Sequence, residues 1–425
     1  MTKKAWTVMV YLAGDNNLDS AGVTDLGEMK KVGSTDQINV VAQFDREAKG
    51  AQTRRYFLKK GGLLDSDVVG NLGETDTGDP KVLIDFVKWS VKNYPAARYM
   101  LVVWNHGNGW DDTDVYRLAR GVGAKITRRG QTIAPANTEG DGGDVSMRRI
   151  RVIATRKHRA LFRTSIEAAV RARGIAYDDN AQDFLDNREL QRVLVAAKKT
   201  IGRNLDVLGL DACLMSMAEV GYENRVATDF TVGSEQTEPG DGWPYNTILG
   251  DLAKKPAMTG RDLASNIVKR YLASYPADGG VTQAACDLAQ SPALLKAISS
   301  LGDIMRAALA DANARAGMIQ SRAQVQSYET ADYVDLQDLC QLLKSNCAQS
   351  PSIVKAAQAV LDACAKYVIA SGAKGNAVAN SHGVSIHFPN NPQAPLSPLY
   401  ANLDFAQDGT WDEFLKAWLG NLQRR

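Results

Sequence analysis

Apolar residues in the first 255 positions follow two alternating patterns, one typical of buried strands and the other of helices. Mainly apolar segments of strand length cover residues 6–13, 38–44, 56–59, 99–104, 205–210 and 230–232, and the segment 99–104 is a continuous apolar run. Apolar residues recur at helical spacing in the segments 80–91, 190–197 and 214–226. Strands that are apolar throughout are buried on both faces, so this alternation predicts an α/β fold with a mostly parallel sheet covered by helices.

The pattern changes in the second half of the chain, where helical spacing dominates. It predicts helices over residues 262–275, 292–316, 333–343, 353–369 and 410–419, with one strand at 383–388. We therefore expect a sheet-containing core over residues 1–255. We expect a mainly helical region over residues 256–425 that contributes the strand 383–388 to the fold.

Residues 111–180 interrupt the core with a long stretch rich in glycine and in basic residues. Three interpretations stay open: a solvated surface insertion, a protease-sensitive linker or propeptide, and a nucleic-acid-binding arm. The third is disfavoured because the segment has few aromatic side chains on which bases could stack.

Composition and charge exclude several classes of protein. The chain is 44% hydrophobic and 23% charged with a net charge of +2, so no global attraction to nucleic acid or membrane is expected. No apolar run approaches the roughly 18–20 residues of a membrane helix. The start of the chain has two lysines before a short apolar run that contains Thr7 and Tyr11, without a cleavage site typical of a signal peptide. We interpret this run as a buried first strand, although a leader removed earlier stays open.

The cysteines are five in number and have no C-x-x-C spacing, which indicates neither a disulfide framework nor a zinc site. They are Cys213, Cys286, Cys340, Cys347 and Cys364. Reduced thiols slightly favour a cytoplasmic protein, and no metal site is predicted.

Two identical triplets, Asp-Ala-Cys, end at Cys213 and Cys364. Cys364 shares a helix face with Ile353, Ala357 and Val360 while Asp362 lies off it, which predicts a core cysteine and a solvated carboxylate. Cys213 follows a strand and precedes a predicted helix, whose N-terminus would favour the thiolate and expose N–H groups to an oxyanion. Position alone leaves both a nucleophile and a core cysteine open for Cys213.

His106 is the histidine best placed to act with a nucleophile. It follows the buried run 99–104 and is flanked by Gly107 and Gly109, which allow a substrate backbone to approach closely. His382 is a second candidate, while His387 alternates within an apolar strand and is expected to be structural. A His and a Cys at the ends of two parallel strands form a plausible thiol-hydrolase pair.

Several motifs resemble those of the clostripain family of cysteine peptidases. They are YLAGDNNL (11–18), VVWNHGNGW (102–110), LGLDACLMSMAEV (208–220), SEQTEPGDGWPY (234–245), YVDLQDL (333–339) and GVSIHFP (383–389). The resemblance implies a caspase-like α/β/α sandwich with helices on both faces of the sheet. It implies that Cys213 is the nucleophile and His106 the general acid/base, with the backbone N–H groups of Gly107 and Cys213 as the oxyanion hole.

The resemblance also implies cleavage after arginine or lysine, and activation by self-cleavage between the His and Cys segments. Residues 111–180 occupy that position and carry basic candidates for processing: Arg120, Lys125, Arg128, Arg129, Arg149 and Arg151. Only some members of the family depend on calcium, so no cofactor is predicted as required and calcium dependence stays open. Peptides or proteins with basic residues are the expected partners, and a monomer or self-processed two-chain form is expected.

Asp211 has two interpretations. Asp211 lies two positions before Cys213 in an extended segment, so its carboxylate points to the same side as Cys213. The carboxylate would disfavour the Cys213 thiolate unless a basic side chain of the substrate neutralised it. We therefore expect Asp211 to line a pocket for arginine or lysine; the alternative is a helix cap. Asp241, in a glycine-rich loop, is either a second acidic pocket residue or a turn aspartate.

Three functional hypotheses follow. The first is an endopeptidase specific for arginine or lysine, made as a zymogen. The second is a caspase-fold regulatory or binding protein whose catalytic site is latent or vestigial. The third is a caspase-like peptidase with non-basic specificity, in which Asp211 would be structural.

Overall fold

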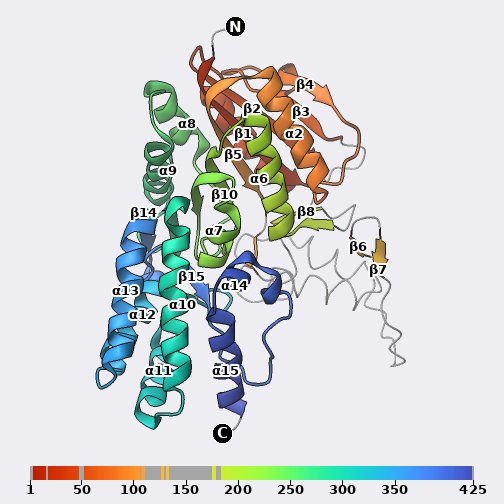
Figure 1. Ribbon diagram of the computed structural model, residues 1–425. Helices are drawn as coiled ribbons and strands as arrows, with labels where there is room; N and C mark the ends of the chain where they lie inside the picture. The colour runs from red at the N-terminus through yellow and green to blue at the C-terminus, as the bar shows by residue number, and fades with distance from the viewer. Residues whose placement is uncertain are drawn as a thin grey trace. The chain divides into compact units, whose positions relative to one another are not determined.

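The computed structural model describes residues 3–15, 18–46, 52–105, 107–110, 126–128, 131–133, 175–178 and 183–423 (Figure 1). It divides into two compact units. Unit 1 comprises Met1–Thr200 with Gly240–Pro256, and unit 2 comprises Ile201–Pro239 with Ala257–Arg425. These units reflect contacts within the chain, and the predicted division at residue 255 stays a prediction.

Five strands of unit 1 lie side by side in the order β5-β1-β2-β3-β4. Their bounds are β1 Lys4–Gly14, β2 Ile38–Arg46, β3 Arg54–Phe57, β4 Val68–Asn71 and β5 Ala96–Trp104. β1 runs parallel to both β2 and β5, whereas β3 and β4 are antiparallel additions. The three parallel strands are those with the long apolar runs, and β1 is buried from Trp6 to Gly14, as strands covered on both faces must be.

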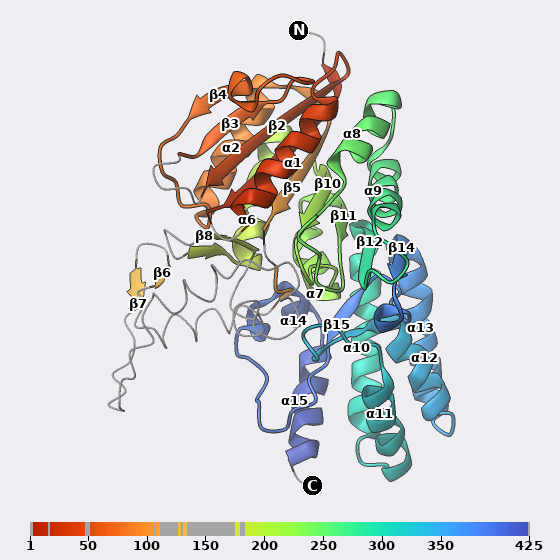
Figure 2. The ribbon, with the colours of Figure 1, turned by 180° about the vertical axis from the view of Figure 1, so that it is seen from behind.

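Helices cover both faces of the unit 1 strands. Figure 1 shows α2 (Pro80–Asn93) in front of the strands, and Figure 2, from behind, shows α1 (Asp19–Val32) in front of them. The helix predicted after Asp79 is confirmed, because the Asp79 carboxylate accepts the Lys81 N–H at 2.8 Å and Pro80 occupies the first helical position. Of the apolar residues predicted at helical spacing, Leu83, Phe86 and Val87 are buried, whereas Val82 and Val91 are half-buried.

The remaining elements in the range of unit 1 are helices and short strand pairs. The helices are η1 Leu64–Asp67, α6 Asn187–Ile201 and α8 Tyr245–Lys254. The antiparallel pairs are β6 Ile126–Arg128 with β7 Gln131–Ile133, and β8 Ile175–Asp178 with β9 Asp183–Leu185.

Unit 2 contributes four strands in the order β14-β12-β11-β10. They are β10 Leu205–Asp211, β11 Thr228–Gly233, β12 Val281–Asp287 and β14 Val368–Lys374. β10 and β11 are parallel, as predicted, while β12 and β14 are antiparallel additions. The sequence prediction missed both additions, since β14 (VIASGAK) is rich in small residues with low strand propensity and β12 (VTQAACD) mixes polar with apolar residues.

Helices dominate the rest of unit 2, together with one short strand pair. The helices are α7 Ala218–Asn224, α9 Gly260–Ser274, η2 Leu288–Gln290, α10 Ser291–Ala308, α11 Ala312–Gln324, α12 Leu336–Asn346, α13 Pro351–Tyr367, η3 Asn376–Val378, η4 Tyr400–Asn402, α14 Asp404–Asp408 and α15 Trp411–Gln423. The pair is β13 Tyr333–Asp335 with β15 Ser385–His387. None of the helices in the described part of the chain has the length and apolar content that a membrane crossing requires.

Two helix predictions in this unit need correction, and caps explain both. The single helix predicted over 292–316 is two helices, because Asp311 caps α11 through the N–H groups of Asn313 and Ala314. The helix predicted over 333–343 starts at Leu336, since residues 333–335 form β13 and Asp335 accepts the Asp338 N–H at 2.7 Å.

Cys364 is a core cysteine, as predicted. It is fully buried on α13 with Ile353, Ala357 and Val360, and Asp362 on the same helix is exposed. Burial raises the pKa of the Cys364 thiol well above its ordinary value, so this thiol stays protonated and inert.

Candidate active site

Residues Ala212–Met217, here called the Cys213 turn, connect the end of β10 to α7. Leu214 in this turn has a φ of 64°, a left-handed conformation that costs a non-glycine residue about 1–2 kcal/mol. Two backbone hydrogen bonds hold it: the Leu214 N–H donates to Gln236 O at 3.2 Å, and the Ser216 N–H donates to Ser234 O at 2.9 Å. The segment Ser234–Glu238 therefore fixes a strained turn, a feature that often accompanies function.

The sulfur of Cys213 lies against Glu238 at the end of that segment. The Glu238 N–H donates to Cys213 Sγ at 3.2 Å, and Sγ lies 3.9 Å from Glu238 O. Cys213 is 7% exposed. An N–H group directed at a sulfur stabilises a thiolate relative to the thiol.

The predicted role of a helix N-terminus beside Cys213 is wrong. The helix expected over 214–226 begins only at Ala218, because Ser216 and Met217 first pair with the strand around Ser385. The N–H that reaches the sulfur instead belongs to Glu238, 25 residues along the chain. The alternative of Asp211 as a helix cap is wrong for the same reason, since the residue at the cap position of α7 is Met217.

Asp211 and Cys213 share surroundings within unit 2. Asp211 is the last residue of β10 and is 5% exposed. Burial raises the pKa of the Tyr271 hydroxyl well above its ordinary value, and the charges of Glu238, Tyr275, Asp211 and Cys213 add to the effect. The pKa of the Tyr271 hydroxyl therefore responds to the charges of both Asp211 and Cys213, as expected for residues two positions apart at a strand end.

Glu238 is a residue of this site that the sequence reasoning missed. Its carboxylate is 8% exposed and accepts the Gln283 Nε2–H at 3.2 Å, while its backbone N–H contacts the sulfur. The available signal was its place in SEQTEPGDGWPY, a motif quoted only for the resemblance. Because its partners are 25 and 45 residues away, spacing along the chain could not reveal the contact.

In unit 1, the loop that follows β5 is held at both ends. The Asn105 side chain donates to Ala13 O at 2.8 Å, and the Asn187 side chain donates to Gly109 O at 2.9 Å. Gly107 is buried in this loop. His106 lies outside the described residues, so its predicted pairing with Cys213 stays a prediction.

The other predicted site residues are placed as follows. Asp241 is exposed at a turn of unit 1. Arg128 ends the short strand β6. The remaining processing candidates lie outside the described residues: Arg120, Lys125, Arg129, Arg149 and Arg151. Within the described ranges, no three His, Cys, Asp or Glu side chains are grouped as metal ligands would be.

β15 connects the Cys213 turn to the C-terminal part of unit 2. The Ser385 N–H donates to Ser216 O at 2.9 Å, and the Ser216 hydroxyl donates to Gly383 O at 2.8 Å. His387 is buried, and burial lowers its pKa to about 3, so it is the neutral structural residue that was predicted.

Glu219 of α7 anchors this strand through a buried carboxyl group. Its Oε1 accepts the His387 N–H and the Tyr400 hydroxyl, each at 2.9 Å. Burial is the main cause that raises the pKa of Glu219 from 4.5 to about 7. The folded chain therefore keeps a proton that the unfolded chain loses between these two pH values.

We expect Glu219→Gln to flatten the pH dependence of stability. In the wild type, the contribution of the neutral carboxyl is complete below about pH 4.5 and is lost as the pH rises to about 7, on the order of 3 kcal/mol. Glutamine does not titrate, so the free energy of unfolding of Glu219→Gln, measured with urea, should decline less between these pH values. The decline due to Glu223, whose pKa is also raised to about 7, should remain, and the exposed control Glu74→Gln should keep the full decline. An unchanged slope in Glu219→Gln would contradict the assignment.

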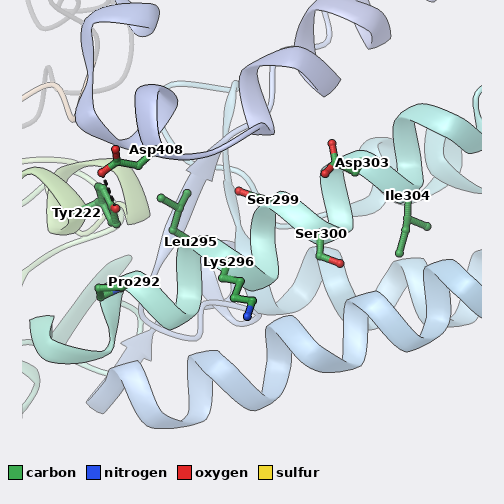
Figure 3. Close-up of a pocket in the computed structure, with 9 residues that line it drawn as sticks. All are labelled: Tyr222, Pro292, Leu295, Lys296, Ser299, Ser300, Asp303, Ile304 and Asp408. Carbon is green, nitrogen blue, oxygen red and sulfur yellow. Dashed lines mark hydrogen bonds between the residues drawn. The ribbon is translucent and has the colours of Figure 1, made fainter.

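A groove also lies along α10, but it has none of the predicted site residues. Its volume is about 420 Å³, and Figure 3 shows Tyr222 hydrogen-bonded to Asp408 at one end and Asp303 and Ile304 at the other. Lys296 is its one basic side chain. No cysteine or histidine is among the residues that line the groove, so we assign it no function.

Comparison with known proteins shows which family the chain belongs to. Residues 10–133 and 158–418 match the clostripain family of C11 peptidases. The chain belongs to the clostripain family. Between residues 10 and 418 the match leaves out residues 134–157, so the family likeness extends into both ends of the segment 111–180. The resemblance to a cysteine-peptidase family that the motifs predicted is therefore confirmed.

Individual relatives agree with the family. Clostripain of Hathewaya histolytica is 25% identical over 270 residues, which cover 57% of this chain and 41% of that protein. A secreted C11 cysteine protease from Bacteroides thetaiotaomicron, solved with an irreversible peptide inhibitor, has 20% identity and a TM-score of 0.60, covering 96% of this chain and all of the other. An inactive zymogen C11 protease from Parabacteroides distasonis has 18% identity and a TM-score of 0.62, covering 96% and 99%. These likenesses confirm the predicted caspase-like fold class.

Proposed function

We propose that this clostripain-family chain is a cysteine endopeptidase with Cys213 as its nucleophile. The observation that carries the proposal is the Glu238 N–H held 3.2 Å from Cys213 Sγ at a strained turn after β10. Of the five cysteines, four show thiol pKa values raised above the ordinary value by burial: Cys286, Cys340, Cys347 and Cys364. Those four stay protonated, which favours Cys213 for the chemistry.

The reaction would follow the usual two steps of a thiol hydrolase. The Cys213 thiol passes its proton to His106 and Sγ attacks the scissile carbonyl carbon, while the backbone N–H groups of Gly107 and Cys213 bind the resulting oxyanion. His106 gives a proton to the leaving amine, so the C–N bond breaks and an acyl-enzyme forms. His106 then removes a proton from water, which attacks the thioester and releases Cys213 as the thiol.

We propose that Asp211 and Asp241 select arginine or lysine before the scissile bond. The buried position of Asp211 supports this, because an unsolvated carboxylate gains strongly from a guanidinium or ammonium partner. A bound basic side chain would also neutralise the charge that opposes the Cys213 thiolate. Peptides or proteins with basic residues are thus the proposed substrates.

The chain is further proposed to be a zymogen that cleaves itself within residues 111–180. The low exposure of Cys213, 7%, fits a thiol that is shielded in the intact chain. Processing would give a two-chain form.

Self-cleavage has a specific expected outcome. Incubated pure protein should yield a new N-terminus directly after one of the basic candidates Arg120, Lys125, Arg128, Arg129, Arg149 or Arg151. Substitution of glutamine for the basic residue that precedes the cleaved bond should leave the chain intact, since a neutral side chain cannot pair with an acidic pocket. Edman sequencing or mass spectrometry of the fragments identifies the site; fragments that begin after acidic or apolar residues would contradict basic specificity.

One experiment tests the whole proposal. Wild type and Cys213→Ala are incubated, new N-termini are sequenced, and fluorogenic peptides with Arg, Lys, Asn or Asp before the bond are assayed with and without calcium. Cleavage of only the Arg and Lys peptides by wild type supports the proposal, and cleavage of the Asn or Asp peptide indicates non-basic specificity. Absence of self-cleavage and of all peptide cleavage would favour a caspase-fold regulatory protein with a latent site.

A further inference from the structure

The segment Ser234–Glu238 has the Cys213 turn on one side and a buried polar cluster on the other. Towards the turn, its backbone contacts Leu214, Ser216 and the Cys213 sulfur. Towards the interior of unit 2, the Glu235 side chain enters the cluster. Any group that fixes Glu235 therefore also fixes the amide that contacts the sulfur three residues later.

Glu235 is 1% exposed and its carboxyl oxygens have partners from distant parts of the chain. The Tyr328 hydroxyl donates to Oε1 at 2.8 Å, and the Gly383 N–H donates to Oε2 at 2.8 Å. The Glu235 backbone N–H donates to Thr282 Oγ1 at 3.0 Å. Gly383 itself has little freedom, because its φ of 105° and a Cβ position only 2.6 Å from the Ser371 Cβ exclude other residues.

Asp335 faces Glu235 as a second buried carboxyl group. It is fully buried and accepts N–H groups from Asp338 at 2.7 Å and His382 at 2.6 Å, and its Oδ1 lies 3.1 Å from His382 Nδ1. Burial, then the charge of Asp335 and a hydrogen bond to it, raise the pKa of Glu235 well above its ordinary value. These causes favour the neutral, protonated form of Glu235.

We propose that the Glu235 carboxyl group is a positioning residue for the catalytic thiol: anchored by Tyr328, Gly383 and Asp335, it holds Ser234–Glu238 against the Cys213 turn. The inference rests on the proposed role of Cys213 as nucleophile. Glu235 touches neither substrate nor sulfur and acts through the backbone of its own segment. Its neutral form is the working form, because an ionised Glu235 would repel Asp335 and weaken the anchor.

Titratable groups from each neighbouring element face this carboxyl pair. They are Tyr328 from the loop before β13, Asp338 and Cys340 from α12, His382 from the loop before β15, Cys286 from β12 and Cys364 from α13. The hydrogen bond to Asp335 is the main cause that raises the pKa of His382, so His382 becomes neutral only as the pH rises. The anchor is therefore expected to weaken towards alkaline pH through both Glu235 and His382.

The decisive variants are Glu235→Gln and Glu235→Ala. The glutamine amide can accept the Gly383 N–H and donate towards Tyr328, whose hydroxyl can turn to Ser381 Oγ at 3.0 Å. We expect Glu235→Ala to slow iodoacetamide alkylation of Cys213 and to lower kcat/KM about 10- to 100-fold. We expect Glu235→Gln to stay within about threefold of wild type at pH 6 and to exceed it increasingly towards pH 9, because glutamine does not ionise.

The readouts separate positioning from simple loss of structure and from failure of the proposed function. Alkylation is measured on the Cys213 peptide by mass spectrometry, so it reports on the thiol even if no peptide is cleaved. The control Glu329→Gln, beside Tyr328 in the same loop, should match wild type at every pH. A ratio of Glu235→Gln to wild type that is independent of pH, or a Glu235→Ala thiol that reacts normally, would overturn the inference. Peptidase activity retained by Cys213→Ala would instead overturn the nucleophile assignment.

Discussion

Replacing Cys213 by alanine is expected to reduce kcat/KM on arginine peptides by about 10⁴-fold or more and to abolish self-cleavage. Loss of the nucleophile removes the acyl-enzyme pathway, and comparable substitutions in a serine peptidase cost about 10⁶-fold in kcat. No other thiol can substitute, because burial raises the pKa values of the remaining four. Steady-state assays with a fluorogenic arginine peptide measure the effect.

The chain provides a matched control in its second Asp-Ala-Cys triplet. Cys364→Ala removes a buried sulfur from the α13 face and should lower stability by about 1 kcal/mol while leaving kcat/KM within about threefold of wild type. Inactivation by Cys364→Ala in a folded protein, or full activity of Cys213→Ala, would reverse the assignment of the two cysteines.

Asp211→Asn is expected to lower kcat/KM for arginine and lysine peptides by about 10²- to 10³-fold. A buried carboxylate that pairs with the substrate cation contributes about 3–4 kcal/mol to binding the transition state, and asparagine keeps the size of the side chain without its charge. Because Asp211 also lies near the sulfur, iodoacetamide alkylation of Cys213 should change far less, by under about tenfold. Comparison of the two rates separates a specificity role from damage to the thiol.

Asp362→Asn is the control for this substitution, since Asp362 is exposed on α13 and lies in the equivalent place of the other triplet. It should leave both rates unchanged. If Asp211→Asn retained its arginine preference, Asp211 would be structural and Asp241 would remain the proposed acidic residue of the pocket. Equal losses of alkylation and cleavage would indicate that Asp211 positions the turn instead.

Most strands of the sheet could be predicted from the local pattern of apolar residues, and the strands that were missed show where that pattern fails. The runs that became β1, β2, β5, β10 and β11 are mainly apolar, which is typical of strands buried on both faces. β12 and β14 escaped because their strand conformation depends on neighbours and on small residues. Strand propensity of such segments is decided by cross-strand packing, which is absent from the sequence read in order.

The start of α7 shows how tertiary pairing overrides a local pattern. Residues 214–226 have helical spacing, yet Leu214 is left-handed and Ser216 pairs with Ser385, 169 residues away. These long-range hydrogen bonds satisfy the backbone of the turn and delay the helix to Ala218. The consequence is chemical, because the N–H group at the sulfur comes from Glu238 and not from a helix end.

The sequence by itself determined the fold class, the family and the difference between two identical triplets. The spacing of apolar residues placed Cys364 on a buried helix face and Cys213 at a strand end, since each of these patterns depends on residues that are close together along the chain. Only the tertiary structure decided what surrounds Cys213. The Glu238 amide reaches the sulfur across 25 residues of chain. The anchor that Glu235 forms with Tyr328 and Gly383 joins segments 93 and 148 residues apart. Their geometry exists only after the chain folds, because hydrogen bonds between remote segments leave no periodic trace along it.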